Sequence, residues 1–142
     1  MSDFPASQAE KMITILFFCR GVLCYSALMI IRIVEDSISL DELREIAKEY
    51  YIDMIKGVAD ISKEIIAVGG EYHMDANMKI LENGSIQSDV WGFNILLDRP
   101  KDERIEFTSL INIRPLAGNR SMEVEDEEIR KKMSDIINRK II

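Results

Sequence analysis

The residues of this chain best suited to chemistry are one histidine and the two carboxylates beside it. Glu71, His73 and Asp75 alternate with apolar residues. If this stretch is a β-strand, the three side chains share one face of the sheet, with neighbours about 6.6–6.8 Å apart. A carboxylate at that distance can orient the imidazole and raise its basicity for proton transfer. The pattern therefore predicts a candidate catalytic group, with His73 as general base and Asp75 or Glu71 as the orienting acid.

The same side chains could approach a divalent cation, but the composition argues against a metal centre. His73 is the only histidine of the chain, and Cys19 and Cys24 lie far upstream. The cysteines are not spaced as a zinc knuckle or a redox Cys-x-x-Cys motif. A transition-metal site normally takes more nitrogen or sulfur ligands than one histidine offers. We therefore expect no metal and no cofactor, and the alternative to a catalytic role is a polar strand face in contact with water.

A second candidate is the loop at residues 114–121, which contains a glycine and precedes a helix. Loops of this kind can hold an anion at the first turn of the helix. Here a run of carboxylates crowds that turn and would repel a phosphate. Three interpretations stay open: Arg114 and Arg120 pair with these acids and pin the loop, the loop binds a small anionic ligand, or it contacts another protein. The candidate ligand-binding residues are Asn94, Asn112, Arg114, Asn119, Arg120 and Ser121.

A β-hairpin would position the first candidate site. Residues 71–81 alternate between polar and apolar, and the Asn-Gly pair at 83–84 is typical of a two-residue type I′ turn. The strand at 87–97 then returns along the first strand. With a two-residue turn, Asn94 lies directly opposite His73. The hairpin therefore predicts that these two side chains meet on the polar face.

A further strand, at residues 104–114, would widen that face. It places Asn112 and Arg114 on the same side of the sheet as His73 and Asp75. Apolar residues lie on the same side: Val90, Leu96 and Leu110. A mixed polar and apolar face of this kind is typical of one that a ligand or a partner subunit covers.

The remaining elements complete an α+β fold. We expect a strand at residues 30–34, a helix from about 40 to 60, a strand at 64–68 and a final helix at about 127–140. Ser39 begins the first helix with a capping box, and Asp126 is the expected N-cap of the last. The element order is β-α-β-β-β-β-α, with an antiparallel meander that the first strand joins through a right-handed crossover. The predicted architecture is a two-layer sandwich with both helices on one sheet face.

Residues 29–142 are predicted to form a single domain, and residues 1–28 an N-terminal extension. Residues 12–31 are mostly apolar, and about 20 such residues could cross a bilayer. Arg20 lies in the middle of this run and would cost roughly 2.5–3.5 kcal/mol there, which argues against a membrane span. Three interpretations stay open: a start site upstream of the true one at Met29, a packing or dimerising helix, and a membrane anchor.

From Met29 onward the sequence resembles a small prokaryotic family that is catalogued only as a domain of unknown function. The resemblance implies no activity. Its carriers are the motifs Ser39-Leu40-Asp41-Glu42-Leu43, Gly69-Gly70-Glu71-Tyr72-His73, Trp91-Gly92-Phe93-Asn94, Ile113-Arg114-Pro115, Gly118-Asn119-Arg120-Ser121 and Val124-Glu125-Asp126.

The composition limits the function classes. A formal net charge of −7 argues against nucleic-acid binding, which needs clustered lysine and arginine. We expect a cytoplasmic binding or interaction module that forms a homodimer through the mixed sheet face. The alternative is a small hydrolase- or transferase-type enzyme, with His73 as base and Arg114 or Arg120 holding an anionic group. A second alternative is a membrane-anchored domain, and whether the chain is an enzyme stays open.

Overall fold

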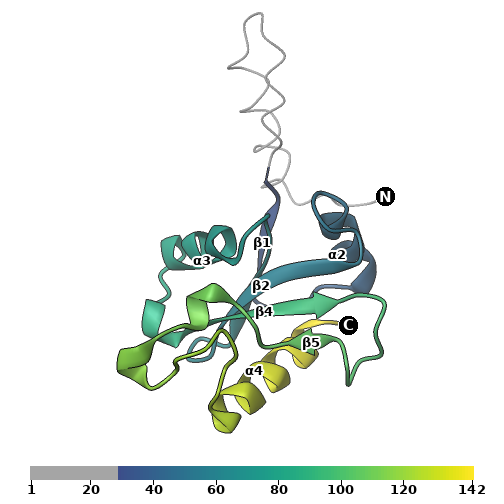
Figure 1. Ribbon diagram of the computed structural model, residues 1–142. Coiled ribbons are helices and arrows are strands. Elements are labelled where there is room, and N and C mark those ends of the chain that lie inside the picture. The colour runs from purple at the N-terminus through teal and green to yellow at the C-terminus, as the bar shows by residue number, and fades with distance from the viewer. Residues whose placement is uncertain (1–28) are drawn as a thin grey trace, which may run out of the picture.

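The computed structural model describes residues 29–142, which form an antiparallel five-stranded sheet with helices packed on it (Figure 1). The strand order is β1-β3-β2-β4-β5. The predicted α+β class, antiparallel sheet and C-terminal helix are confirmed. The elements are β1 (Ile31–Val34), α2 (Leu40–Ala47), β2 (Met54–Asp60), β3 (Ile65–Gly69), α3 (His73–Glu82), β4 (Val90–Leu96), β5 (Ile105–Glu106) and α4 (Glu127–Lys140), with 3-10 turns η1 (Gln87–Asp89), η2 (Leu110–Asn112) and η3 (Pro115–Ala117).

Helices α2 and α4 cover one face of the sheet and enclose the larger part of the core. Alternate residues of β4, among them Phe93 and Ile95, are fully buried against them. Both helices begin as the sequence predicts. The Ser39 hydroxyl accepts a hydrogen bond from the Glu42 N–H at 3.1 Å, and Asp126 caps the first turn of α4. Capping satisfies amide groups that have no partner inside the helix.

The two predicted helices, α2 and α4, share one sheet face as expected, and helix α3, which was not predicted, covers the opposite face. Its buried residues Ala76 and Ile80 pack against Val58 of β2, Ala67 of β3 and Val90 of β4. Figure 1 shows α3 and α4 on opposite sides of the sheet. The face that was predicted to be open to a ligand or partner is therefore largely filled by the chain's own helix.

Residues 71–81 are not a strand, because glycines and caps at both ends commit them to α3. Gly69 and Gly70 have φ of +112° and +90°, which turns the chain away from β3 before the helix begins. At the other end, the Gly84 N–H donates to Leu81 at 3.0 Å and the Ser85 N–H donates to Ile80 at 3.2 Å. This is the Schellman pattern of a helix C-terminus. The Asn-Gly pair ends a helix here instead of making a hairpin turn.

The predicted helix at 40–60 is also wrong beyond Ala47, where α2 ends. Residues 54–60 form β2, the central strand of the sheet, and are mostly buried on both faces. A strand buried on both faces shows no polar alternation and cannot be told from a buried helix by periodicity. Gly57 is needed in this strand, since a Cβ there would lie 2.6 Å from the Phe93 ring. β2 pairs with β3 as a hairpin, and β1 pairs antiparallel with the other side of β3. The connection from β1 through α2 to β2 therefore passes over β3 and joins two parallel strands, so a crossover of the first strand is present as predicted.

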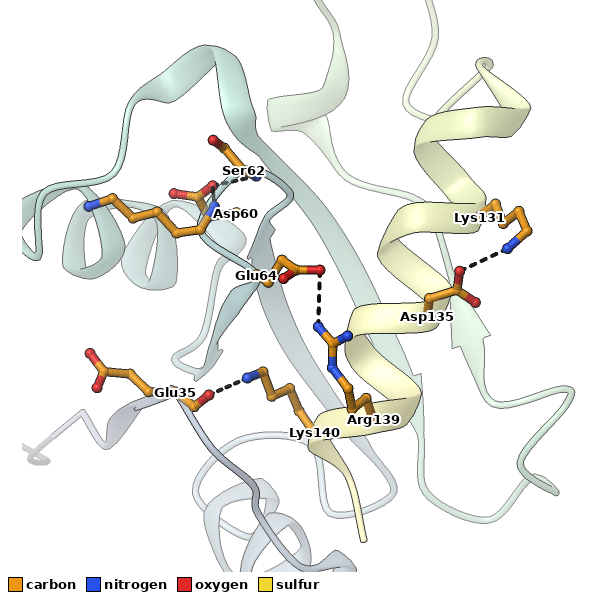
Figure 2. Close-up of polar contacts among 9 residues, drawn as sticks. Glu35, Asp60, Ser62, Glu64, Lys131, Asp135, Arg139 and Lys140 are labelled. Atoms are coloured by element: carbon orange, nitrogen blue, oxygen red, sulfur yellow. Dashed lines mark hydrogen bonds and ion pairs between the residues drawn. The ribbon is translucent and has the colours of Figure 1, made fainter.

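The turn between β2 and β3 is held by hydrogen bonds within the turn and by an ion pair with α4 (Figure 2). The Asp60 carboxylate accepts hydrogen bonds from the backbone N–H groups of Ser62 and Lys63, both at 2.9 Å. Glu64 forms an ion pair with Arg139 of α4 at 3.2 Å. Nearby, Lys140 of α4 donates to the backbone carbonyl of Glu35, just after β1 (Figure 2). The end of α4 is thereby tied to β1 and to the β2–β3 turn.

The predicted strand at 104–114 is wrong for most of its length, because only Ile105–Glu106 pairs with β4. At Gly92 a side chain replaces the missing strand. The buried Asn112 amide accepts from the Gly92 N–H at 2.8 Å and donates to the Gly92 carbonyl at 3.1 Å. A Cβ on Gly92 would lie 2.5 Å from Ser109, so only glycine permits this close approach.

Candidate functional site

His73 is the first residue of α3 and points its ring at β4. Its Nε2 lies 2.9 Å from the backbone carbonyl oxygen of Phe93. Because a carbonyl only accepts, Nε2 carries the proton and Nδ1 is the acceptor in the neutral ring. Burial lowers the pKa of His73, and the Lys56 charge acts in the same direction, whereas contacts with Phe93 and Asn94 raise it. The net shift is downward, so the site favours a neutral imidazole.

A row of polar residues crosses the sheet beside His73. Lys56 of β2 is paired with Asn94 of β4, which is paired in turn with Glu106 of β5. The Asn94 amide donates to the Glu106 carboxylate at 3.3 Å. Asn94 thus lies beside His73 as predicted. The two side chains are brought together by the packing of α3 on β4, not by a hairpin. Lys56 was not among the predicted site residues, because residues 40–60 were expected to be helical.

Two tyrosines flank the ammonium group of Lys56. Its Nζ lies 4.8 Å from the centroid of the Tyr51 ring and 5.8 Å from that of the Tyr72 ring. A lysine over aromatic rings is stabilised by the negative ring faces. The Tyr51 hydroxyl is itself fixed, since it donates to the Glu71 carbonyl at 2.7 Å. The aromatic pair therefore holds this charge near His73 without a carboxylate.

Glu71 and Asp75 do not form the predicted strand face with His73. Residues two apart on a helix point about 200° apart around its axis, so Asp75 cannot share a face with His73. The Asp75 carboxylate instead accepts the Tyr72 N–H at 2.9 Å and so caps α3. Glu71 lies before the helix, with an exposed side chain. The prediction that Glu71, His73 and Asp75 share one face is therefore wrong, because residues 73–82 form a helix.

Arg114 is held against β4 by main-chain acceptors. Its guanidinium donates to the carbonyls of Ser88 and Ile111, each at 3.3 Å, and to that of Val90. It also lies 4.3 Å from the centroid of the Trp91 ring. Burial lowers the pKa of Arg114, yet an arginine stays charged in proteins. The side chain pins its loop, through carbonyls instead of the acids that were expected.

The other polar residues of the loop are also occupied. The buried Asn119 amide donates to the carbonyls of Asn112, Ser121 and Glu123 at 2.7–3.0 Å, and accepts from the backbone N–H of Glu125. The backbone N–H of Arg120 donates to the Glu125 carboxylate at 3.1 Å. The Ser121 hydroxyl donates to the Glu123 carbonyl at 3.3 Å. These contacts shape the loop, and ligand binding by its residues stays a prediction.

Two shallow surface depressions of residues 29–142 do not include His73. One, of about 300 Å³, is lined by residues 32–37 and Asn83. The other, of about 280 Å³, lies between the 117–119 loop and the start of α4, and Trp91 is among its lining residues. Within the same residues, no group of three or more histidine, cysteine or acidic side chains could hold a metal ion. No helix in this part of the chain has the length and apolar character to cross a membrane.

A group of exposed apolar side chains lies on and beside α3. Helix α3 carries two of them on its outer side, and η2 packs against α3. Figure 1 shows α3 and the turns that follow it on the same side of the molecule. We call this group the α3 surface; its members and their exposed fractions are Met74 50%, Met78 57%, Ile86 64%, Leu110 69% and Ile113 41%.

The fold and the site together define a small α+β domain with a half-buried histidine and an exposed apolar surface. The chain belongs to the family described as "Protein of unknown function (DUF5674)", which matches residues 32–140. This membership confirms the predicted resemblance to a domain of unknown function. No curated protein and no solved structure matches the chain. Any functional assignment therefore depends on the geometry of this domain.

Proposed function

We propose that this protein is an interaction module that acts as a homodimer, with the α3 surface as the contact between the two copies. The observation that carries the proposal is the exposure of five large apolar side chains on adjoining segments, each at 41–69%. Soluble monomers rarely leave a contiguous apolar patch open to water, and such patches mark interaction sites. The predicted contact on the mixed sheet face is replaced by one on the outer side of α3, because α3 occupies that sheet face.

The residues of the α3 surface suit a contact with a second copy. Met74 and Met78 lie one turn apart, and methionine adapts its shape to the surface that it meets. Lys79 runs beside this pair and lies 3.9 Å from Glu82 of the same helix. If two α3 helices pack antiparallel about a two-fold axis, Met74 of each copy approaches Met78 of the other. A self-complementary apolar pattern of this kind supports an isologous dimer.

The enzyme alternative lacks a comparable observation. His73 contacts a backbone carbonyl, and neither of the two depressions described above includes it. His73 contacts the Phe93 carbonyl, and Arg114 contacts the Val90 carbonyl. These two positions are three residues apart on β4, or about 10 Å along the strand. An anionic group on Arg114 would displace its carbonyl contacts.

A cytoplasmic location is part of the proposal, since residues 29–142 contain no cysteine that an oxidising compartment could pair.

The test is the effect of Met78→Glu on the mass of the full-length chain in solution. Light scattering after size exclusion, over a series of concentrations, should show the wild-type chain associated. Met78→Glu should lose this contact, because a carboxylate buried in an apolar contact is costly. The matched control is Ile52→Glu, which adds the same charge at a side chain that is 75% exposed and outside the α3 surface. The proposal is wrong if Met78→Glu, folded by circular dichroism, keeps the wild-type mass.

A further inference from the structure

The indole ring of Trp91 carries a buried polar atom without a partner. The residue is only 4% exposed, and among residues 29–142 its Nε1 has no hydrogen-bond partner. An indole N–H can only donate a hydrogen bond. Buried polar groups in native proteins nearly always have a partner, and one without a partner needs an explanation. The Trp91 N–H therefore indicates an acceptor that does not come from these residues.

A shallow depression lies against the same residue. Trp91 lines the depression of about 280 Å³ described above, together with residues 117–119 and the start of α4. It is the only residue lining either depression that has a buried polar atom without a partner. Access is open at Gly118, where an added Cβ would meet no atom within 4 Å. We call this feature the Trp91 depression, and its volume is close to the roughly 300 Å³ at which ligand sites begin.

Two carboxylates line the Trp91 depression, and one of them is open to a ligand. Asp126 is committed to α4, because its Oδ1 accepts from the N–H groups of Glu128 and Ile129. Glu125 accepts the Arg120 N–H at 3.1 Å through Oε2. Glu125 is exposed, so its Oε1 is free to accept a hydrogen bond from a ligand.

The charge around the depression favours a cation. Its lining includes no lysine and no arginine, and two further carboxylates, Glu127 and Glu128, follow in the first turn of α4. The guanidinium of Arg114 lies 4.3 Å from the centroid of the Trp91 ring, but it donates to backbone carbonyls and does not line the depression. Opposite charges attract more strongly where water is partly excluded. The Trp91 depression therefore favours a positively charged ligand, in contrast to the anion predicted for the 114–121 loop.

We propose that the Trp91 depression binds an alkylammonium group that has a carbonyl oxygen close to it. The carbonyl accepts the Trp91 N–H, and the ammonium group donates to the Glu125 carboxylate. Carbon atoms of the ligand contact Ala117 and Ile129, the aliphatic side chains of the lining. Amino-acid amides and the free N-termini of peptides both present these two groups together. The site shares no residue with the α3 surface, so the proposal does not depend on the dimer.

The test is an NMR titration of the full-length chain with glycinamide, which carries both groups. Trp91 is the only tryptophan of the chain, so its indole N–H gives a single proton–nitrogen peak. Glycinamide should shift this peak saturably, with a dissociation constant on the order of 1 mM. Acetylglycinamide keeps the carbonyl but has no charge, and it should bind at least about tenfold more weakly. Inorganic phosphate should leave the peak in place.

Two variants separate the contact with Glu125 from a general effect of charge. Glu125→Gln keeps an oxygen for the Arg120 N–H and removes the charge, so the dissociation constant for glycinamide should rise about tenfold. Glu103→Gln removes the same charge from an exposed loop and should keep the wild-type value. The proposal is overturned if the indole peak stays in place up to about 100 mM glycinamide, or if phosphate alone shifts it. It is equally overturned if acetylglycinamide binds as well as glycinamide, or if Glu125→Gln matches Glu103→Gln.

The same titration distinguishes the two sources of this chemistry. Triglycine amide presents the two groups of glycinamide at the N-terminus of a peptide and extends beyond them. A dissociation constant at least about tenfold lower than that of glycinamide identifies the N-terminus of a peptide as the ligand. Equal constants identify a small amine, because nothing beyond the ammonium and the carbonyl then adds to binding.

Discussion

Replacing Arg114 with alanine should destabilise the fold by about 2–4 kcal/mol. The guanidinium donates to three backbone carbonyls and stacks on the Trp91 ring. A buried hydrogen bond from a charged donor contributes about 1.5–3 kcal/mol, and a cation over an aromatic ring about 0.5–1 kcal/mol at an exposed site. Arg114 is only half-buried, so water replaces part of these contacts in the variant. The expected loss is a large fraction of the roughly 5–15 kcal/mol of a typical domain.

Urea unfolding followed by tryptophan fluorescence measures this loss directly. Trp91 is the only tryptophan of the chain and lies under the guanidinium. Arg114→Lys should recover only a small part of the loss, because an ammonium group cannot reach three carbonyls at once. Arg120→Ala is the matched control, since its side chain is exposed, and it should stay within about 0.5 kcal/mol of wild type. An Arg114→Ala loss below about 1 kcal/mol would refute the loop-pinning role and favour the anion-binding interpretation.

Three further predictions concern single residues. Ile52 has φ of +61° and is 75% exposed, so Ile52→Gly should raise the free energy of unfolding by about 1 kcal/mol in urea titrations, and a loss would contradict the strain. Gly57→Ala should lower the melting temperature markedly, because its Cβ would lie 2.6 Å from the Phe93 ring; an unchanged melt would show that β2 can shift. The pKa of His73 lies below its ordinary value of 6.5, so the unfolded chain takes up a proton first and stability should fall as the pH drops below about 6.5. His73→Gln should show a smaller loss of melting temperature between pH 7.5 and 5.5, and equal losses would exclude the histidine as the cause.

The helix ends were predictable where a local signal has one meaning. Ser39 and Asp126 cap α2 and α4 as expected, and α4 ends at Lys140. The Asn-Gly pair at 83–84 has two meanings, since it favours both a type I′ turn and a helix C-terminus. Met, Ala, Lys, Leu and Glu, all good helix formers, precede it within residues 73–82. That preference, together with the four-residue spacing of Ala76 and Ile80, was the available signal for α3.

The neighbours of His73 could be predicted from the sequence only where they did not depend on which strands pair. Asn94 lies beside His73 as expected, but Lys56 reaches them through the β2–β4 pairing, which joins segments far apart in the sequence. The roles of Asn112 and Asn119 also depend on non-local contacts, since each amide binds backbone groups of other segments. Residue type and spacing identify such side chains as candidates for a binding or structural role. They do not say whether the partner is a ligand or the chain itself.

The measurement that tests the account most directly is the mass of the full-length wild-type chain as a function of concentration, by sedimentation equilibrium. Self-association through apolar contacts predicts a mass at least twice the 16.3 kDa of one chain at micromolar concentration. A chain that stays at the monomer mass up to about 1 mM, where a contact would be worth only about 4 kcal/mol, would contradict it.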